Sequence, residues 1–227
     1  MNNALNNPAW NALTSGNSHL AKGVGNVRYF DPEVSPIVGL ARHDGSLLNG
    51  LHQQIADDSP RVVFTPEEIQ VPACWKLLRY ISGYQMVCNH PATTANTGST
   101  AILPLDEEHI PQLLELTRLT APGPFAQRTI EFGHYEGVFD ADKVVAMAGQ
   151  RLHVNECTEI SAVCTHPDYL GRGYARQLLL SQISRMTAAG NTPFLHVRDD
   201  NERAINVYKA LGFEISSVMN FYFIEKV

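Results

Sequence analysis

The feature that most constrains the fold is a strand that runs through a glycine-rich loop into a helix, between Glu159 and Ala175. The segment 157–165 is rich in apolar and β-branched residues, as strands are. Gly171 and Gly173 follow it, and the residues after them have the apolar period of a helix. A strand, a tight loop and a helix in this order are typical of an α/β protein.

The rest of the second half of the chain alternates the same two patterns. Asp106 is the predicted N-cap of the first helix there, and Gly190 is the predicted stop of the long helix after the glycine loop. The first of these helices has Ile110 to Thr117 on its apolar face, and the long one has Ala175 to Met186 on its apolar face. Two further helices are predicted at 126–132 and 202–211, and strands at 135–139, 144–154, 157–165, 194–197 and 214–225. Helices, a hairpin and then β-α-β-α-β predict a mixed α/β sheet.

The first half of the chain is separated from the second by a run of small and turn-forming residues at 91–100, which is typical of a linker. We therefore predict two segments, 1–92 and 99–227. In the first segment we predict strands at 27–30, 36–40, 61–65 and 84–88, and helices at 47–55 and 74–81. The pair Gly83-Tyr84 resembles Gly212-Phe213, so the first segment is interpreted as a degenerate copy of the second, packed against it.

Composition excludes several classes of partner. The 227 residues include 17 Lys and Arg against 23 Asp and Glu, with no basic run, which argues against nucleic acid or an anionic membrane as a partner. No apolar stretch reaches the ~18 residues that span a bilayer. The four cysteines form no C-x-x-C pair and the histidines are scattered, so we expect no metal site, reduced thiols and a cytoplasmic location.

The glycine loop has the chemistry of an anion site. The first N–H groups of a helix have no partner within the helix, and the helix dipole adds positive potential there. Arg172 and Arg176 stand in this first turn, where cations are unfavourable unless an anion is bound, so the loop is predicted to bind phosphate. The dinucleotide fingerprint fails because Arg176 stands where it needs glycine or alanine, and the Walker pattern is absent.

Three ordered motifs narrow this prediction: the strand end Val163–Pro167, the loop Leu170–Ala175, and the pattern N-x-x-A-x-x-x-Y-x-x-x-G-F from Asn201 to Phe213. Together they closely resemble the GNAT N-acetyltransferase superfamily, over roughly residues 100–227. The resemblance implies the GNAT fold, a mixed and mostly antiparallel sheet flanked by helices. It also implies acetyl-CoA as co-substrate and no metal.

The resemblance also assigns roles to individual positions. Tyr208 would protonate the leaving thiolate, and Glu159 would be the general base. Leu170 departs from the Arg or Gln that is usual there, so one phosphate contact is missing, for which Arg172 or Arg176 can substitute. The implied cofactor-binding residues are Val163, Cys164, Thr165, Leu170, Gly171, Arg172, Gly173, Tyr174, Ala175, Arg176, Asn201, Ala204 and Tyr208.

Alternatives stay open at several of these positions. Strict alternation along 157–165 would place Glu159 and Val163 on one face of the strand. His196 is a rival base, Tyr208 also fits a core aromatic, and Asn201 also fits an N-cap. The regions that shape the acceptor pocket in the family contain Phe125, Arg128, His196 and Tyr222.

The predicted function is an acetyl-CoA-dependent N-acetyltransferase, in which a primary amine of a small molecule or peptide attacks the thioester directly in a ternary complex. One alternative is a non-catalytic acyl-CoA-binding or regulatory module. Asn201 and Tyr208 argue against it, because a binding module needs the glycine loop but no acid. A second alternative is an N-acyltransferase that uses a longer acyl-CoA.

Overall fold

One continuous sheet organises the molecule. A computed structural model describes residues 3–91 and 100–227, and within these ranges eleven strands pair in the order β1-β2-β3-β4-β11-β5-β10-β9-β8-β7-β6. The strands are β1 (Ala21–Lys22), β2 (Val27–Phe30), β3 (Ile37–Leu40), β4 (Arg61–Thr65), β5 (Trp75–Cys88), β6 (Leu103–Pro104), β7 (Glu136–Asp140), β8 (Lys143–Val154), β9 (Cys157–Thr165), β10 (Thr192–Arg198) and β11 (Phe213–Lys226). Only β3–β4 and β9–β10 are parallel among these pairs, which confirms a mixed and mostly antiparallel sheet.

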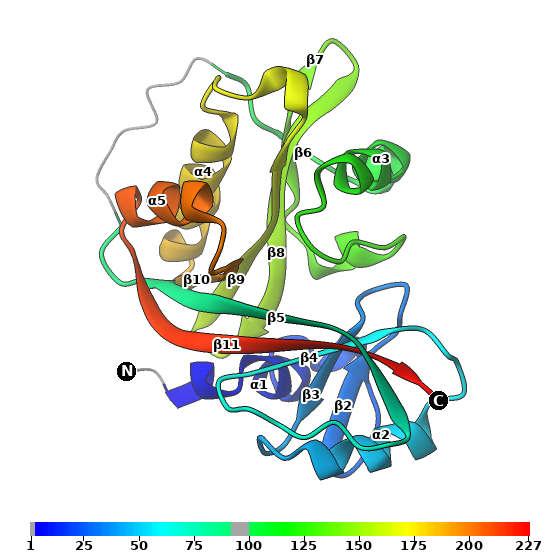
Figure 1. The fold of residues 1–227 in the computed structure, drawn as a ribbon. Coiled ribbons are helices and arrows are strands. Elements are labelled where there is room, and N and C mark those ends of the chain that lie inside the picture. The colour runs from blue at the N-terminus through cyan, green and yellow to red at the C-terminus, as the bar shows by residue number, and fades with distance from the viewer. Residues whose placement is uncertain (1–2, 92–99) are drawn as a thin grey trace.

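Helices cover both faces of this sheet (Figure 1). The α-helices are α1 (Pro8–Thr14), α2 (Leu48–Gln54), α3 (Ile110–Thr120), α4 (Tyr174–Ala188) and α5 (Glu202–Ala210). Short 3-10 turns are η1 (Asn3–Asn6), η2 (Ser18–Leu20), η3 (Gly45–Leu47), η4 (Glu107–His109), η5 (Thr129–Phe132) and η6 (Pro167–Tyr169). The sequence therefore located the helices of the second half, with the segment 126–132 reduced to the single turn η5.

Two of the buried apolar clusters lie on opposite faces of the sheet. On one face, Leu13 of α1 and Leu113 of α3 belong to the same buried cluster as Phe194 of β10. On the other face, Leu179 of α4 and Ile205 of α5 belong to a second cluster, with Leu195 and Val197 of β10. Side chains alternate along β10, so its successive residues contribute to the two cores in turn.

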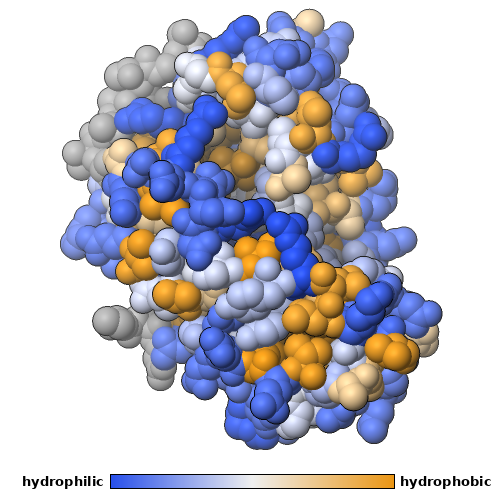
Figure 2. All heavy atoms as spheres, viewed as in Figure 1, coloured by the Kyte–Doolittle hydropathy of each residue, from blue (hydrophilic) through white to orange (hydrophobic). Residues whose placement is uncertain are grey.

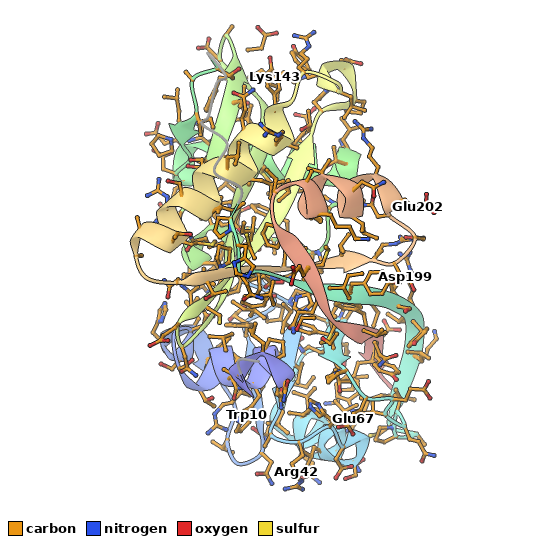
Figure 3. The ribbon with its side chains drawn as sticks, turned by 90° about the vertical axis from the view of Figure 1, so that its left-hand side faces the viewer. Trp10, Arg42, Glu67, Lys143, Asp199 and Glu202 are labelled. Atoms are coloured by element: carbon orange, nitrogen blue, oxygen red, sulfur yellow. The ribbon has the colours of Figure 1, made fainter. Side chains whose placement is uncertain are left out.

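The sheet order is symmetric about its central pair, β11 and β5. On one side β3 and β4 form a parallel pair joined through α2, and on the other side β9 and β10 form a parallel pair joined through α4. β5 and β11 are 14 residues each and pair end to end, from Phe213 opposite Cys88 to Lys226 opposite Trp75. Figure 3 shows the two halves from the side, with Trp10 in the lower one and Lys143 in the upper one.

Each half contributes its last strand to the other half. β5 pairs with β10 of the second half, and β11 pairs with β4 of the first half. In Figure 1 these two long strands cross the middle of the molecule, between the lower half with α1 and α2 and the upper half with α3, α4 and α5. The row of strands that includes β9 and β10 is therefore continued by a strand from the first half of the chain.

The helix predicted over 74–81 is wrong, because residues 75–81 belong to β5. Leu77, Leu78 and Ile81 have the spacing of an apolar helix face, but in the structure Leu77 and Leu78 are 46% and 43% exposed. Their strand is held by backbone pairing with β11 along its whole length. Figure 2 shows apolar side chains gathered over this part of the surface.

The predicted correspondence of Gly83-Tyr84 with Gly212-Phe213 also fails. Gly212 lies between α5 and the first residue of β11, whereas Gly83 lies inside β5, opposite Met219. The symmetry of the two halves rests instead on the end-to-end pairing of β5 and β11. Most of the predicted linker, residues 92–99, lies outside the described residues.

Candidate active site

An opening in the sheet lies between β9 and β10. These parallel strands pair only from Thr192 opposite Cys157 to Phe194 opposite Glu159. Beyond this last pair β9 continues to Thr165, whereas β10 continues along β5. The strands therefore diverge just after Glu159, and the backbone on the facing edges of the opening is available to a ligand.

A β-bulge interrupts β9 inside this opening. Ala162 has a φ of 53°, and between the pairs Cys164–Met147 and Ser161–Gly149 β9 contains one residue more than β8. A bulge leaves its extra residue unpaired with the neighbouring strand. It also corrects the predicted alternation, because Val163 packs with α4 on the face opposite to that of Ala162 and Glu159.

The glycine loop leads directly into α4. Gly171 and Gly173 have φ of 78° and 77°, which is the left-handed region that glycine adopts without strain. A Cβ at Gly171 would meet no atom within 4 Å, and one at Gly173 only the side-chain nitrogen of Gln177 at 4.0 Å. Gly173 is the N-cap and supplies no side chain, so no N-cap side chain occupies the N-terminus of α4. This is the geometry of an anion site.

Arginine side chains flank the loop. The guanidinium of Arg172 lies 4.7 Å from the ring centroid of Tyr169, whose hydroxyl donates to Asp140. Arg176 is exposed in the first turn of α4, and Leu170 is also exposed at the start of the loop. The ring of Tyr169 thus holds one cation beside the N-terminus of α4.

α5 brings Tyr208 toward the same opening. Asn201 is the N-cap of α5, which was the alternative to its predicted cofactor role, and its side-chain oxygen accepts from the N–H of Ala204 at 3.2 Å. Tyr208 packs beside Val163 in the core under α4 and α5, and the structure records no hydrogen bond from its hydroxyl to the described part of the chain. Burial raises the pKa of this hydroxyl to about 12, so it stays protonated near neutral pH.

Glu159 lies in a buried ionic cluster on the opposite face. Its two carboxylate oxygens accept from Arg151 at 2.6 and 2.8 Å, and one of them is 2.7 Å from Nδ1 of His196. Burial alone would raise the pKa of the Glu159 carboxyl, but the charge of Arg151 and the hydrogen bonds from Arg151 and His196 hold it at about 2. A carboxylate held this way has little capacity to accept a proton, so the geometry does not favour Glu159 as the base.

The low pKa of Glu159 predicts a specific acid sensitivity. Because the pKa of Glu159 is lower in the folded protein than its ordinary value of 4.5, its ionised form stabilises the fold. This contribution is complete above about pH 4.5 and is lost as the pH falls toward 2. At about 1.4 kcal/mol per pKa unit, the shift corresponds to about 3 kcal/mol. We expect the difference in unfolding free energy between wild type and Glu159→Gln to shrink by about this amount between pH 5 and pH 2, measured by urea denaturation. The exposed Glu115→Gln variant should lose the same unfolding free energy as wild type between pH 5 and pH 2. If Glu159→Gln also loses as much as wild type over this range, the assignment of the low pKa to Glu159 is contradicted.

The candidate acceptor residues are not all in one place. The ring centroids of Phe125 and Tyr135 are 5.7 Å apart, and Tyr135 lies beside the ionic cluster. Arg128 instead pairs with Glu131 on the surface, and the Tyr222 hydroxyl accepts from the N–H of Ile69 within the lower half. The structure therefore brings Phe125 and His196 toward the opening, but neither Arg128 nor Tyr222.

Two residues of this region were missed by the sequence reasoning. Arg151 is a charged residue in the mostly buried part of strand β8, and a buried charge needs a partner of opposite sign. That signal pointed to a buried acid nearby. Tyr135 gave no such signal, since its ring simply packs over Gly149 in the core.

Comparison with known proteins agrees with this geometry. A family model described as FR47-like protein matches residues 135–222. The crystal structure of a protein assigned to the GNAT family of acetyltransferases, from Novosphingobium aromaticivorans, is 31% identical, with a TM-score of 0.91 and full coverage of both chains. This chain belongs to the GNAT family of acetyltransferases. The match includes the first half as well as the half that carries the opening.

Curated relatives match a shorter part of this GNAT acetyltransferase. The N-alpha-acetyltransferase RimI of Mycobacterium tuberculosis is 33% identical over 84 residues, which is 36% of this chain and 52% of RimI. An uncharacterized protein of Mycobacterium leprae is 39% identical over 83 residues, or 35% of this chain and 23% of that protein. The matched segments thus span about half or less of these relatives.

Two kinds of feature are absent from the described residues. Of the helices in residues 3–91 and 100–227, none is long and apolar enough to cross a membrane. In the same ranges no three His, Cys, Asp or Glu side chains are grouped so that they can hold a metal ion.

Proposed function

We propose that this GNAT acetyltransferase uses acetyl-CoA to acetylate a primary amine of a small molecule or peptide, by direct attack in a ternary complex. The observation that carries the proposal is the opening between β9 and β10, which has the β9 bulge on one edge and leads into the N-terminus of α4, where no side chain caps the helix. The name of the relative RimI, an N-alpha-acetyltransferase, supports an amine as acceptor.

The residues present fit a CoA thioester. The open space around Gly171 and Gly173 admits a pyrophosphate to the N–H groups of α4, and Arg172 lies beside it. The backbone of Val163–Thr165 would pair with the pantetheine arm as an added strand. Cys164 is buried on the far face, so it contributes backbone only. Asn201 and Ala204 would border the cofactor from the first turn of α5.

The reaction requires two proton movements. As the acceptor nitrogen forms its bond to the thioester carbonyl carbon, it gives up a proton to a base. The oxyanion needs a fixed N–H donor, which the β9 bulge at Ala162–Val163 can supply. As the C–S bond breaks, the thiolate takes the Tyr208 hydroxyl proton. Tyr208 suits this role because its hydroxyl is protonated and has no competing acceptor within the described residues.

Replacing Tyr208 by Phe tests the acid. We expect kcat to fall by about 10- to 1,000-fold, the range of general acid catalysis, while acetyl-CoA affinity stays the same because the ring is kept. A coupled assay of released CoA and calorimetric titration measure the two quantities. Tyr29→Phe is the matched control, since it removes a hydroxyl that contacts Gln54 in the lower half. Full kcat in Tyr208→Phe would leave this residue a packing role only.

We also propose that the first half is a degenerate GNAT half that binds no CoA and helps to form the acceptor side. The repeated parallel pairs with their helices, and the exchanged strands β5 and β11, support this. The loop before α2 is closed, because a Cβ at Gly45 would lie 1.9 Å from the carbonyl oxygen of Gln70. The Asp44 side chain already accepts from the N–H of Ser46 there. An anion would therefore find no space beside Gly45, and the Ser46 N–H donor is already taken.

A thiol-release assay decides among the functional classes. Acetyl-CoA is incubated with a panel of primary amines and N-terminal peptides, and free CoA is measured with DTNB. Release that depends on an amine supports the proposal. Acetyl-CoA binding by calorimetry without release on any amine would favour the non-catalytic binding module. A higher kcat/KM with longer acyl-CoA esters would favour the alternative acyl donor. We place the reaction in the cytoplasm, where the four free cysteines would stay reduced.

A further inference from the structure

The ionic cluster of Arg151, Glu159 and His196 lies at the closed end of the opening. Glu159 forms the last pair between β9 and β10, and His196 is two residues further along β10, on the same face. The β9 bulge at Ala162 forms the other edge. The side chain of His196 is 3% exposed, so the cluster is a built part of the protein rather than a surface contact.

Hydrogen bonding fixes the tautomer of His196. The Glu159 carboxylate is ionised and can only accept, so Nδ1 of His196 at 2.7 Å must carry a proton and donate it. In the neutral ring Nε2 is then a free acceptor. Within the described residues this buried Nε2 has no hydrogen-bond partner, and neither does the buried hydroxyl of Tyr135. Buried polar atoms are normally satisfied, so an unpaired acceptor marks a place for a ligand group or water.

His196 and Tyr208 reach the opening from opposite faces of the sheet. Tyr208 packs with Leu195 and Val197, whereas His196 alternates with them and points to the other side. A thioester held between the strands would thus have a proton donor on the face of α4 and α5 and a proton acceptor on the face of α1 and α3. An attacking amine and a leaving thiolate need this division of roles.

We propose that His196 is the general base of the acetyl transfer and that Glu159, clamped by Arg151, positions it. This inference rests on the proposed function. Nε2 takes the proton that the acceptor nitrogen loses as its bond to the carbonyl carbon forms, while the C–S electrons leave on sulfur and Tyr208 protonates the thiolate. Arg151 neutralises Glu159 and fixes its two oxygens, so one of them stays aligned with Nδ1. Glu159 and Arg151 do not touch substrate in this assignment.

Few charged or titratable groups face His196, and they lie on one side of its ring. The charged or titratable groups that face it are Glu159 on β9 and, behind that carboxylate, Arg151 on β8 and Tyr135 before β7. β5 places Gln85 opposite it in the sheet. The remaining neighbours are apolar rings from β4, β10 and β11, namely Phe64, Phe194 and Phe221.

Two measurements on the full chain test the inference. The first is the ¹⁵N spectrum of the imidazole in wild type, which needs no substrate and should show a protonated Nδ1 and an unprotonated Nε2. The second is kinetics on His196→Asn, whose amide still donates to Glu159 but has no basic nitrogen, and on His196→Ala with added imidazole. We expect kcat to fall by about 100-fold or more in both variants, with KM for acetyl-CoA unchanged. Imidazole should restore at least a tenth of wild-type kcat to His196→Ala, and the acidic limb of the pH profile should be absent from His196→Asn.

A matched control is available in the lower half. His52 also has a buried Nε2 without a partner, but its ring meets Trp75 edge-on, and within residues 3–91 and 100–227 no ion pair joins it to a carboxylate. His52→Asn should keep kcat and the pH profile. Suppose that wild type releases CoA. Then an unchanged kcat in His196→Asn, or a failure of imidazole to rescue His196→Ala, would overturn the base assignment and leave the proposed function standing. No CoA release by wild type on any amine would overturn both, and a protonated Nε2 at neutral pH would overturn the tautomer and the base role alone.

Discussion

Chains that begin at Thr97 are expected to aggregate and to lose cooperative unfolding. Such a fragment keeps β9, β10 and the glycine loop but loses β5, which lies between β11 and β10 in the sheet. Met86 and Cys88 of β5 are buried in the core under α4 and α5. At ~1.5–3 kcal/mol per large buried apolar side chain, losing this strand and the surface it covers removes much of a typical total stability of about 5–15 kcal/mol. The edges of β10 and β11 would also be open to pairing with other chains.

Light scattering and urea unfolding of the fragment measure this effect. The control is a split protein, in which residues 1–91 and 97–227 are expressed together. It lacks only residues outside the described ranges, so we expect it to be soluble and to release CoA like wild type. A fragment from Thr97 that is soluble, monomeric and fully active alone would show that the first half is an independent domain. The proposal of a degenerate half that completes the fold would then be wrong.

Local signals were sufficient for most of the second half. The period of apolar residues located α3, α4 and α5, and the caps agree in detail: Asp106 accepts from the N–H of Glu108, and Asn201 from that of Ala204. Gly190 ends the long helix with a φ of 79°. These features depend on residues within one or two turns of each other, so the sequence alone determines them.

The features that failed depend on residues far apart in the chain. The prediction of a helix failed only for the first part of β5, whose apolar spacing also fits a helix, whereas the strand predicted at 84–88 is confirmed. Only pairing with β11, about 140 residues away, makes residues 75–81 a strand. The bulge at Ala162 is set by the register with β8, so no simple alternation along β9 could find it. The role of Glu159 depends on Arg151 and His196, which come from two other strands. Motif resemblance located the site, but only the assembled sheet distinguishes a free carboxylate from a neutralised one.

Replacing Gly173 by Val should abolish acetyl-CoA binding. The branched side chain would stand at the N-terminus of α4, in the space where a pyrophosphate meets the first N–H groups. It would also strain the backbone, because φ at this position is 77°. We expect Kd measured by calorimetry to rise by at least about 100-fold, equivalent to about 2.7 kcal/mol.

The two effects of Gly173→Val, backbone strain and blocked access of the pyrophosphate, can be distinguished with a second variant, at Gly190 just after the other end of α4. Gly190 has a φ of 79°, and a Cβ added there would meet no atom within 4 Å. Gly173 has a similar φ, and a Cβ added there would meet only one atom, the side-chain nitrogen of Gln177. Gly190→Val should therefore cost a similar amount of unfolding free energy, about 1–2 kcal/mol, but leave acetyl-CoA affinity unchanged. If both variants lose affinity equally, the effect comes from destabilising α4. If neither does, the cofactor does not bind at this helix terminus, and the assignment of the loop Leu170–Ala175 is refuted.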